Sequence, residues 1–82
     1  MKHQQATLVL YIYGQGYFCR RLPVDPRVAQ LAWRLTKQDK VTVYDCHIDE
    51  TGPHCDCYDG LKREGTGKMC KHLLALKEVH LL

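Results

Sequence analysis

Two short pairs of metal-ligand residue types constrain this chain more than any other feature. Cys55 and Cys57 form a Cys-x-Cys pair, and Cys70 and His72 form a Cys-x-His pair. The segment between Cys57 and Cys70 is mostly polar and contains glycines, so it can bring the two pairs together. Three thiolates and one imidazole complete the tetrahedral shell of a structural zinc ion. We therefore predict one structural Zn²⁺ bound by these four residues.

Local structure gives each pair a reason to bind one ion. In an extended strand, side chains two residues apart share a face, so Cys55 and Cys57 reach the same point while Asp56 points away. Cys70 and His72 are expected in the first turn of a helix, where the N-terminal dipole favours thiolates. The two pairs are therefore predicted to converge from a strand and from a helix start.

Metal binding is favoured over disulfides in this chain. The apolar run at residues 8–13 is too short for a secretory signal, and no apolar run approaches the ~18 residues of a membrane span. We expect a cytoplasmic protein without membrane contact, in which thiols stay reduced. A disulfide between Cys55 and Cys57 would close a very tight ring, and one to Cys70 would leave an odd thiol. His54, beside Cys55, and His80 remain alternative ligands.

The sequence predicts a small α+β domain of order ββαββα. Strands are expected at residues 6–13 and 17–22, a helix at 26–37, strands at 40–48 and 54–58, and a helix from residue 68 or 69 towards 78. The first helix is predicted because Asp25 is a suitable N-cap and Pro26 a suitable first residue. Its apolar stripe consists of Val28, Leu31, Ala32 and Leu35. Residues 1–82 are expected to form one domain, with a ββα platform at 1–40 clamped to a zinc finger at 41–80.

The second half of the chain resembles a known family. The segment from Cys55-Asp56-Cys57 to Cys70-Lys71-His72-Leu73-Leu74-Ala75-Leu76 resembles the SWIM-type zinc finger, whose pattern is C-x-C-x(n)-C-x-H followed by an apolar helix. The resemblance covers about residues 41–80, and residues 1–40 resemble no family that we can name. It implies a non-catalytic module that binds DNA or proteins.

The positive charges suggest a partner. A formal net charge of +3 permits a nucleic-acid partner without demanding one. The candidate contacts to DNA or RNA are Lys62, Arg63, Lys68 and Lys71 around the finger, and Arg20 and Arg21 in the first hairpin. Tyr11, Tyr13 and Tyr17 lie beside these arginines, an arrangement that can stack single-stranded bases but that more often forms the outer face of a sheet. The alternative is a zinc-stabilised protein–protein adaptor that uses the aromatic hairpin or Trp33.

No enzyme motif is found. The chain has no P-loop and no G-x-S-x-G, and the glycines at 14 and 16 lack the rest of a dinucleotide fingerprint. A zinc ion with four protein ligands has no open position for a reacting water. We therefore expect no catalysis and no small-molecule substrate. Cys19 and Cys46 are expected to be core residues, and Trp33 to cover a core edge.

Overall fold

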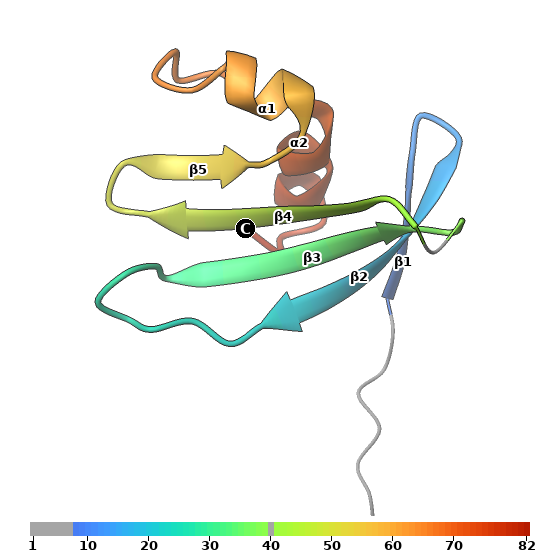
Figure 1. Cartoon of the computed structure of the whole chain (residues 1–82), viewed down its shortest axis with the longest axis horizontal. Coiled ribbons are helices and arrows are strands. Elements are labelled where there is room, and N and C mark those ends of the chain that lie inside the picture. Colours follow the sequence, from blue (N-terminus) through green and yellow to red (C-terminus); the bar gives the residue numbers. More distant parts are fainter. Residues whose placement is uncertain (1–7, 40) are drawn as a thin grey trace, which may run out of the picture.

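One antiparallel sheet runs through both halves of the chain. The computed structural model describes residues 8–39 and 41–82, and it shows a small α+β protein whose five strands lie in the order β1-β2-β3-β4-β5 (Figure 1). The strands are β1 (Leu8–Ile12), β2 (Gln15–Leu22), β3 (Leu31–Lys37), β4 (Val43–Asp49) and β5 (Gly52–Cys55). Two helices follow, α1 (Tyr58–Lys62) and α2 (Lys71–Glu78). Two of the predicted strands were expected to begin at residues 6 and 40. Residues 6, 7 and 40 lie outside the described residues.

The first hairpin has a two-residue turn that suits the twist of the sheet. Ile12 pairs with Gln15, and the residues between them, Tyr13 and Gly14, have φ values of 51° and 79°. Positive φ at both central positions is the geometry of a type I′ turn, which matches the right-handed twist of paired strands. The predicted hairpin at the start of the chain is therefore present.

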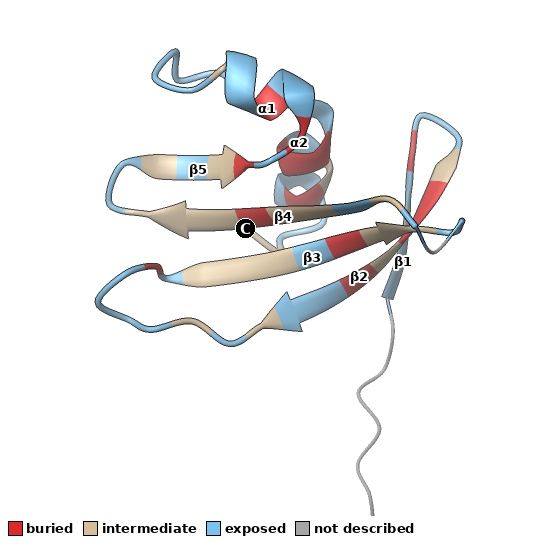
Figure 2. Cartoon of the chain, in the orientation of Figure 1, coloured by how far each residue is buried: buried red, intermediate tan, exposed pale blue. Residues whose placement is uncertain are grey.

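The core lies between one face of the sheet and α2. On this inner face the strands carry Tyr17, Cys19, Leu35 and Cys46, which are buried, and α2 adds Leu73 and Leu76. Figure 2 shows the buried residues as a band that crosses the strands and continues into α2. All five cysteines belong to this core, so large aliphatic side chains fill only part of it. A core of this composition gains less from apolar burial than one of Leu, Ile and Phe.

The predicted helix at residues 26–37 is wrong. Asp25 caps a single turn, in which its carbonyl oxygen accepts from the N–H groups of Val28 (2.8 Å) and Ala29 (3.0 Å). The chain then joins the sheet: the Gln30 N–H donates to the Ile48 carbonyl oxygen at 2.8 Å. Residues 31–37 continue as β3, paired with both β2 and β4. The expected ββα platform is therefore three strands of a continuous sheet.

The strand prevails because its residues fit a period of two as well as a helical period. Leu31, Trp33 and Leu35, at every second position of β3, lie on the inner face. The predicted helix would also have buried Val28, which is 72% exposed in the structure. As the central strand, β3 also supplies backbone partners to β2 and β4, which would otherwise present unpaired edges. Long-range pairing therefore outweighs the local helix signal.

The end of α2 is closed by a helix-capping motif and by Trp33. The Leu81 N–H donates to the Leu76 carbonyl oxygen at 2.9 Å, and the His80 N–H donates to that of Lys77 at 3.0 Å. His80 has φ 62°, so it takes the left-handed position of a Schellman motif. The Trp33 indole N–H then donates to the Leu81 carbonyl oxygen at 2.8 Å. Trp33 covers an edge of the core, as expected, and holds the residues after α2 against β3.

Neither α1 nor α2, the helices of the described chain, has the length and apolar character needed to span a membrane.

Candidate metal centre

The four predicted ligands meet in one buried cluster. One ligand atom from each of Cys55, Cys57, Cys70 and His72 lies within 4.8 Å of all the others, and all four residues are buried. The Cys55 and Cys70 sulfurs are 3.8 and 3.9 Å from His72 Nδ1. Tetrahedral zinc places a sulfur and a nitrogen ligand about 3.6 Å apart, given its usual bond lengths. The cluster therefore has the size and the donor set of a site that could hold a metal ion.

The Cys-x-Cys pair approaches the cluster in a way that differs from the prediction. Cys55 is the last residue of β5, but Cys57 is the N-cap of α1, a helix that the sequence did not predict. The expected strand at 54–58 therefore ends at Cys55. Asp56 turns back to β4, where its carboxylate accepts from the Asp45 N–H at 2.8 Å. A strand end followed by a helix cap thus replaces the two-residue alternation.

Gly60 of α1 supports Cys57 and allows the close approach of Cys55. Its N–H donates to the Cys57 sulfur at 3.1 Å. Such N–H···S bonds stabilise the negative charge of a metal-bound thiolate. A Cβ at position 60 would collide with the carbonyl oxygen of Cys55. Glycine is therefore needed here for space, because α1 packs directly against β5, the strand that carries Cys55.

The Cys-x-His pair is placed as predicted, at the start of a helix. Cys70 is the N-cap of α2 and His72 lies in its first turn. With Nδ1 turned to the sulfurs, the other ring nitrogen, Nε2, lies 3.2 Å from the Tyr17 hydroxyl, to which it can donate. A metal-ligating histidine typically gives its second nitrogen such a partner. Tyr17 is therefore a support for the site on the inner face, and its buried ring is not available to stack a base.

Without a metal ion, the thiols of the cluster are held in their protonated form. The Cys55 thiol and burial raise the pKa of Cys70 to about 11. Burial raises the pKa of Cys57. The thiol of Cys46, followed by burial, raises the pKa of Cys55. A divalent cation would displace these protons and replace the neutral thiols by thiolates, so this donor set fits zinc chemically.

Cys46 is a neighbour of the site that sequence reasoning did not place there. It was expected in the core, and it is buried there, but it also pairs directly with Cys55 across β4 and β5. Only the register of these two strands brings the residues together. Cys19 is the other expected core cysteine, and burial raises the pKa of its thiol to about 11.

The two alternative histidine ligands lie elsewhere. His54 alternates with Cys55 along β5 and faces the opposite side of the sheet, where its ring contacts Asp49 and Glu64. Glu64, and then Asp49, raise the pKa of His54. His80 is exposed beyond the end of α2. Neither histidine belongs to the cluster of thiols.

The basic residues named as nucleic-acid contacts fall into two separate sets. Arg20 and Arg21 are exposed on β2, whereas Lys62, Arg63, Lys68 and Lys71 surround α1 and the start of α2. α1 packs beside β5, and β3 and β4 separate β2 from that edge of the sheet (Figure 1). The structure therefore does not join the two sets in one surface.

Comparisons with protein families, with curated proteins and with solved structures give no match for this chain.

Proposed function

We propose that this chain is a zinc-stabilised binding module of the SWIM type, with one structural Zn²⁺ held by Cys55, Cys57, Cys70 and His72. The observation that carries the proposal is the convergence of three buried sulfurs and one buried imidazole nitrogen on one point. The buried shell lies at the centre of the small core, so metal binding contributes directly to folding. The free thiols of this shell suit a reducing compartment such as the cytoplasm.

Binding, rather than catalysis, is the role that such a site supports. Four protein ligands saturate tetrahedral zinc and leave no position for a water or a substrate. Two polar atoms of the shell already have hydrogen-bond partners: the Cys57 sulfur contacts the Gly60 N–H, and His72 Nε2 contacts the Tyr17 hydroxyl. We therefore assign the ion to holding β5, α1 and α2 together, and we place the partner on the surface that these elements form.

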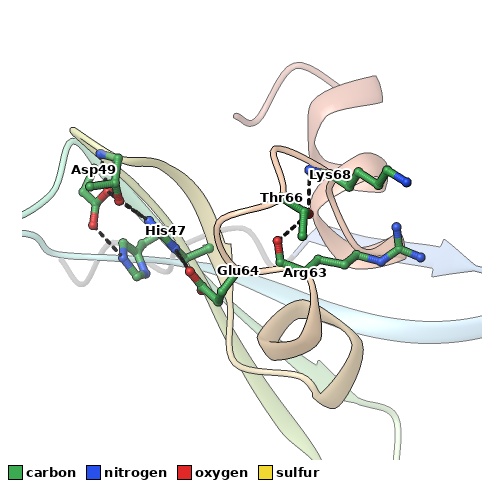
Figure 3. Close-up of polar contacts among 8 residues, drawn as sticks. His47, Asp49, Arg63, Glu64, Thr66 and Lys68 are labelled. Atoms are coloured by element: carbon green, nitrogen blue, oxygen red, sulfur yellow. Dashed lines mark hydrogen bonds and ion pairs between the residues drawn. The ribbon is translucent and has the colours of Figure 1, made fainter.

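We propose nucleic acid as that partner, bound by the lysines and the arginine around the finger. Thr66 orders the loop between α1 and α2, because its hydroxyl donates to the Arg63 carbonyl oxygen at 2.6 Å and accepts from the Lys68 N–H at 3.1 Å. Figure 3 shows Arg63 and Lys68 on the side of the loop that faces away from Asp49. Arg63 is paired with Asp59 at 2.9 Å. No ion pair of the described residues includes Lys62, Lys68 or Lys71, so the charges of these lysines are available to phosphates.

The test is an anisotropy titration with labelled single-stranded DNA, double-stranded DNA and RNA at low and moderate salt. We expect binding that falls steeply with salt, because phosphate contacts release counterions. Lys71→Ala should weaken it, whereas Lys77→Ala, the same change near the other end of α2, should have little effect. No binding to any of the three at low salt would reject nucleic acid as the partner.

The second candidate is a protein–protein adaptor, which the exposed aromatic side chains of the first hairpin favour. Tyr11 and Tyr13 are 70% and 87% exposed, an unusual position for large aromatic residues. Trp33 was also considered for this role, but its indole N–H is hydrogen-bonded to the Leu81 carbonyl oxygen. If the chain is an adaptor, an affinity pull-down with it should recover a protein partner in stoichiometric amount. Tyr13→Ser should abolish that recovery. Recovery of nucleic acid alone would argue against it.

A further inference from the structure

The outer side of the β4–β5 hairpin carries a second group of metal-ligand residues. His47 pairs with His54 across the two strands, one position away from the Cys46–Cys55 pair. Because side chains alternate along a strand, the sulfurs face the core and the imidazoles face outward. Asp49, at the end of β4, lies beside both rings. Its carboxylate oxygens are 3.3 Å from His47 Nε2 and 3.0 Å from His54 Nε2.

The geometry points to a second, solvent-open site for a divalent transition-metal ion, bound by His47, Asp49 and His54. One ligand atom of each residue lies within 4.8 Å of the other two. Two bonds of about 2.1 Å to a common ion span a comparable distance, so small ring movements bring the three donors into one shell. Two imidazoles and one carboxylate suit zinc and the later first-row metals, and disfavour Mg²⁺ or Ca²⁺.

The surroundings orient His54 as they orient metal-bound histidines. Its Nδ1 lies 2.9 Å from both carboxylate oxygens of Glu64, which leaves Nε2 turned towards Asp49 and the Thr51 hydroxyl, 2.6 Å away. A carboxylate on the second ring nitrogen fixes the tautomer and makes the first a better ligand. Thr51 holds Asp49 in turn, through bonds from its N–H (2.8 Å) and its hydroxyl (2.6 Å). Figure 3 shows Glu64 turned towards the hairpin, whereas the adjacent Arg63 points away.

This site differs from the buried cluster in its access to solvent. The side chains of His47, Asp49 and His54 are 41%, 25% and 19% exposed. His54, Glu64 and Thr51 also line a cavity of about 160 Å³. Three protein ligands leave at least one position for water or for a donor group of a partner, as in zinc sites that exchange ligands. The second ion is therefore exchangeable, whereas the ion in the thiol cluster is enclosed.

The site is tested by isothermal titration of Zn²⁺ into protein that already contains one equivalent of zinc. We expect one further ion per chain with micromolar affinity, and at least a tenfold loss of affinity in His47→Ala and in Asp49→Asn. Asp45→Asn is the matched control, because it removes a carboxylate from the same face of β4 without touching the cluster, and it should bind as the parent does.

Two results would overturn the proposal: no uptake beyond the first equivalent, or an affinity that neither variant changes. The thiol cluster is monitored separately by the absorption spectrum of the Co²⁺-substituted protein, since only a cobalt–thiolate site gives the intense ultraviolet charge-transfer band. If the parent shows this band but takes up no second equivalent, only the outer site fails; if the band is absent, the thiol cluster fails. In His47→Ala the band should remain while the second ion is lost. Circular dichroism of each variant verifies that it is folded.

Discussion

The two faces of the β4–β5 hairpin bear similar donor groups in opposite surroundings. On the inner face, Cys46 and Cys55 are paired, and both lie in the core next to α1 and α2. On the outer face, His47 and His54 are paired, their rings are stacked at 4.9 Å, and they remain accessible to water. Outside the hairpin, Ala32 of β3 pairs with His47, and Glu64 contacts the His54 ring.

The difference shows how burial decides the role of a ligand group. A buried thiol cluster that loses its ion leaves uncompensated polar groups and poor packing at the centre of the core, so ion and fold depend on each other. An exposed imidazole is solvated in either state, so its ion can come and go at little cost to the fold. The inner face should therefore determine stability, and the outer face should not.

The largest effect should come from removing a ligand of the inner face. Cys70→Ser replaces a soft thiolate by a hydroxyl, and we expect loss of the tightly bound zinc and of cooperative thermal unfolding. Cys19→Ser is the matched control, because it changes a buried cysteine outside the cluster and should retain one zinc per chain. Metal analysis and circular dichroism measure both outcomes. Equal zinc content in Cys70→Ser and the parent would refute the ligand set.

Gly60→Ala should destabilise the protein by about 1–3 kcal/mol, because the added Cβ forces the carbonyl group of Cys55 away from α1. Alanine is the better helix former, so helix propensity alone predicts the opposite sign. Lys62→Ala, on the exposed side of the same helix, should change the free energy of unfolding by less than about 0.5 kcal/mol. Denaturant titration compares the two. A Gly60→Ala protein at least as stable as the parent would contradict the close packing of α1 on β5.

Trp33→Phe should cost about 1 kcal/mol, because it keeps an aromatic ring on the inner face but removes the donor to the Leu81 carbonyl oxygen. Trp33 pairs with Cys46 across β3 and β4, yet it does not touch the metal cluster through a polar group. We therefore expect zinc content to be unchanged while the melting temperature falls. A variant that also loses zinc would show that the C-terminal closure and the metal centre are one unit.

The smallest effect is expected on the outer face. His47→Ala should change the free energy of unfolding by less than about 0.5 kcal/mol, since the ring is half-exposed and its contact to Asp49 is solvated. Denaturant titration at one equivalent of zinc measures it without occupying the second site. A loss comparable to that of Cys70→Ser would erase the contrast between the two faces.

Part of the site was visible in the sequence because it depends on local spacing. The Cys-x-His pair lies at the start of a helix in the sequence pattern and in the structure, and the first hairpin follows from its glycines and alternating residues. The Cys-x-Cys pair was found for the right residue types but with the wrong geometry. Cys57 is instead the N-cap of a short helix whose Gly60 packs against Cys55, a contact that the spacing of the cysteines does not reveal.

The helix expected at 26–37 shows where local reasoning fails. Leu31 and Leu35 are four residues apart, a spacing that satisfies a helical period and also a period of two. The N-cap signal at Asp25 is real, but the structure uses it for one turn only. What decides between the two is the need of β2 and β4 for a partner between them, and that need lies in distant parts of the chain.

The amino-acid sequence by itself identified the four residues of the candidate metal cluster, because three cysteines and a histidine in two close pairs have few other uses in a small domain. Only the tertiary structure decided that Tyr17 supports His72, that Cys46 lies beside Cys55, and that His47, Asp49 and His54 meet on the outer face. Each of these contacts depends on strand register. A shift of one residue would exchange the two faces of a strand, and no local pattern specifies the register of strands that pair across the whole sheet.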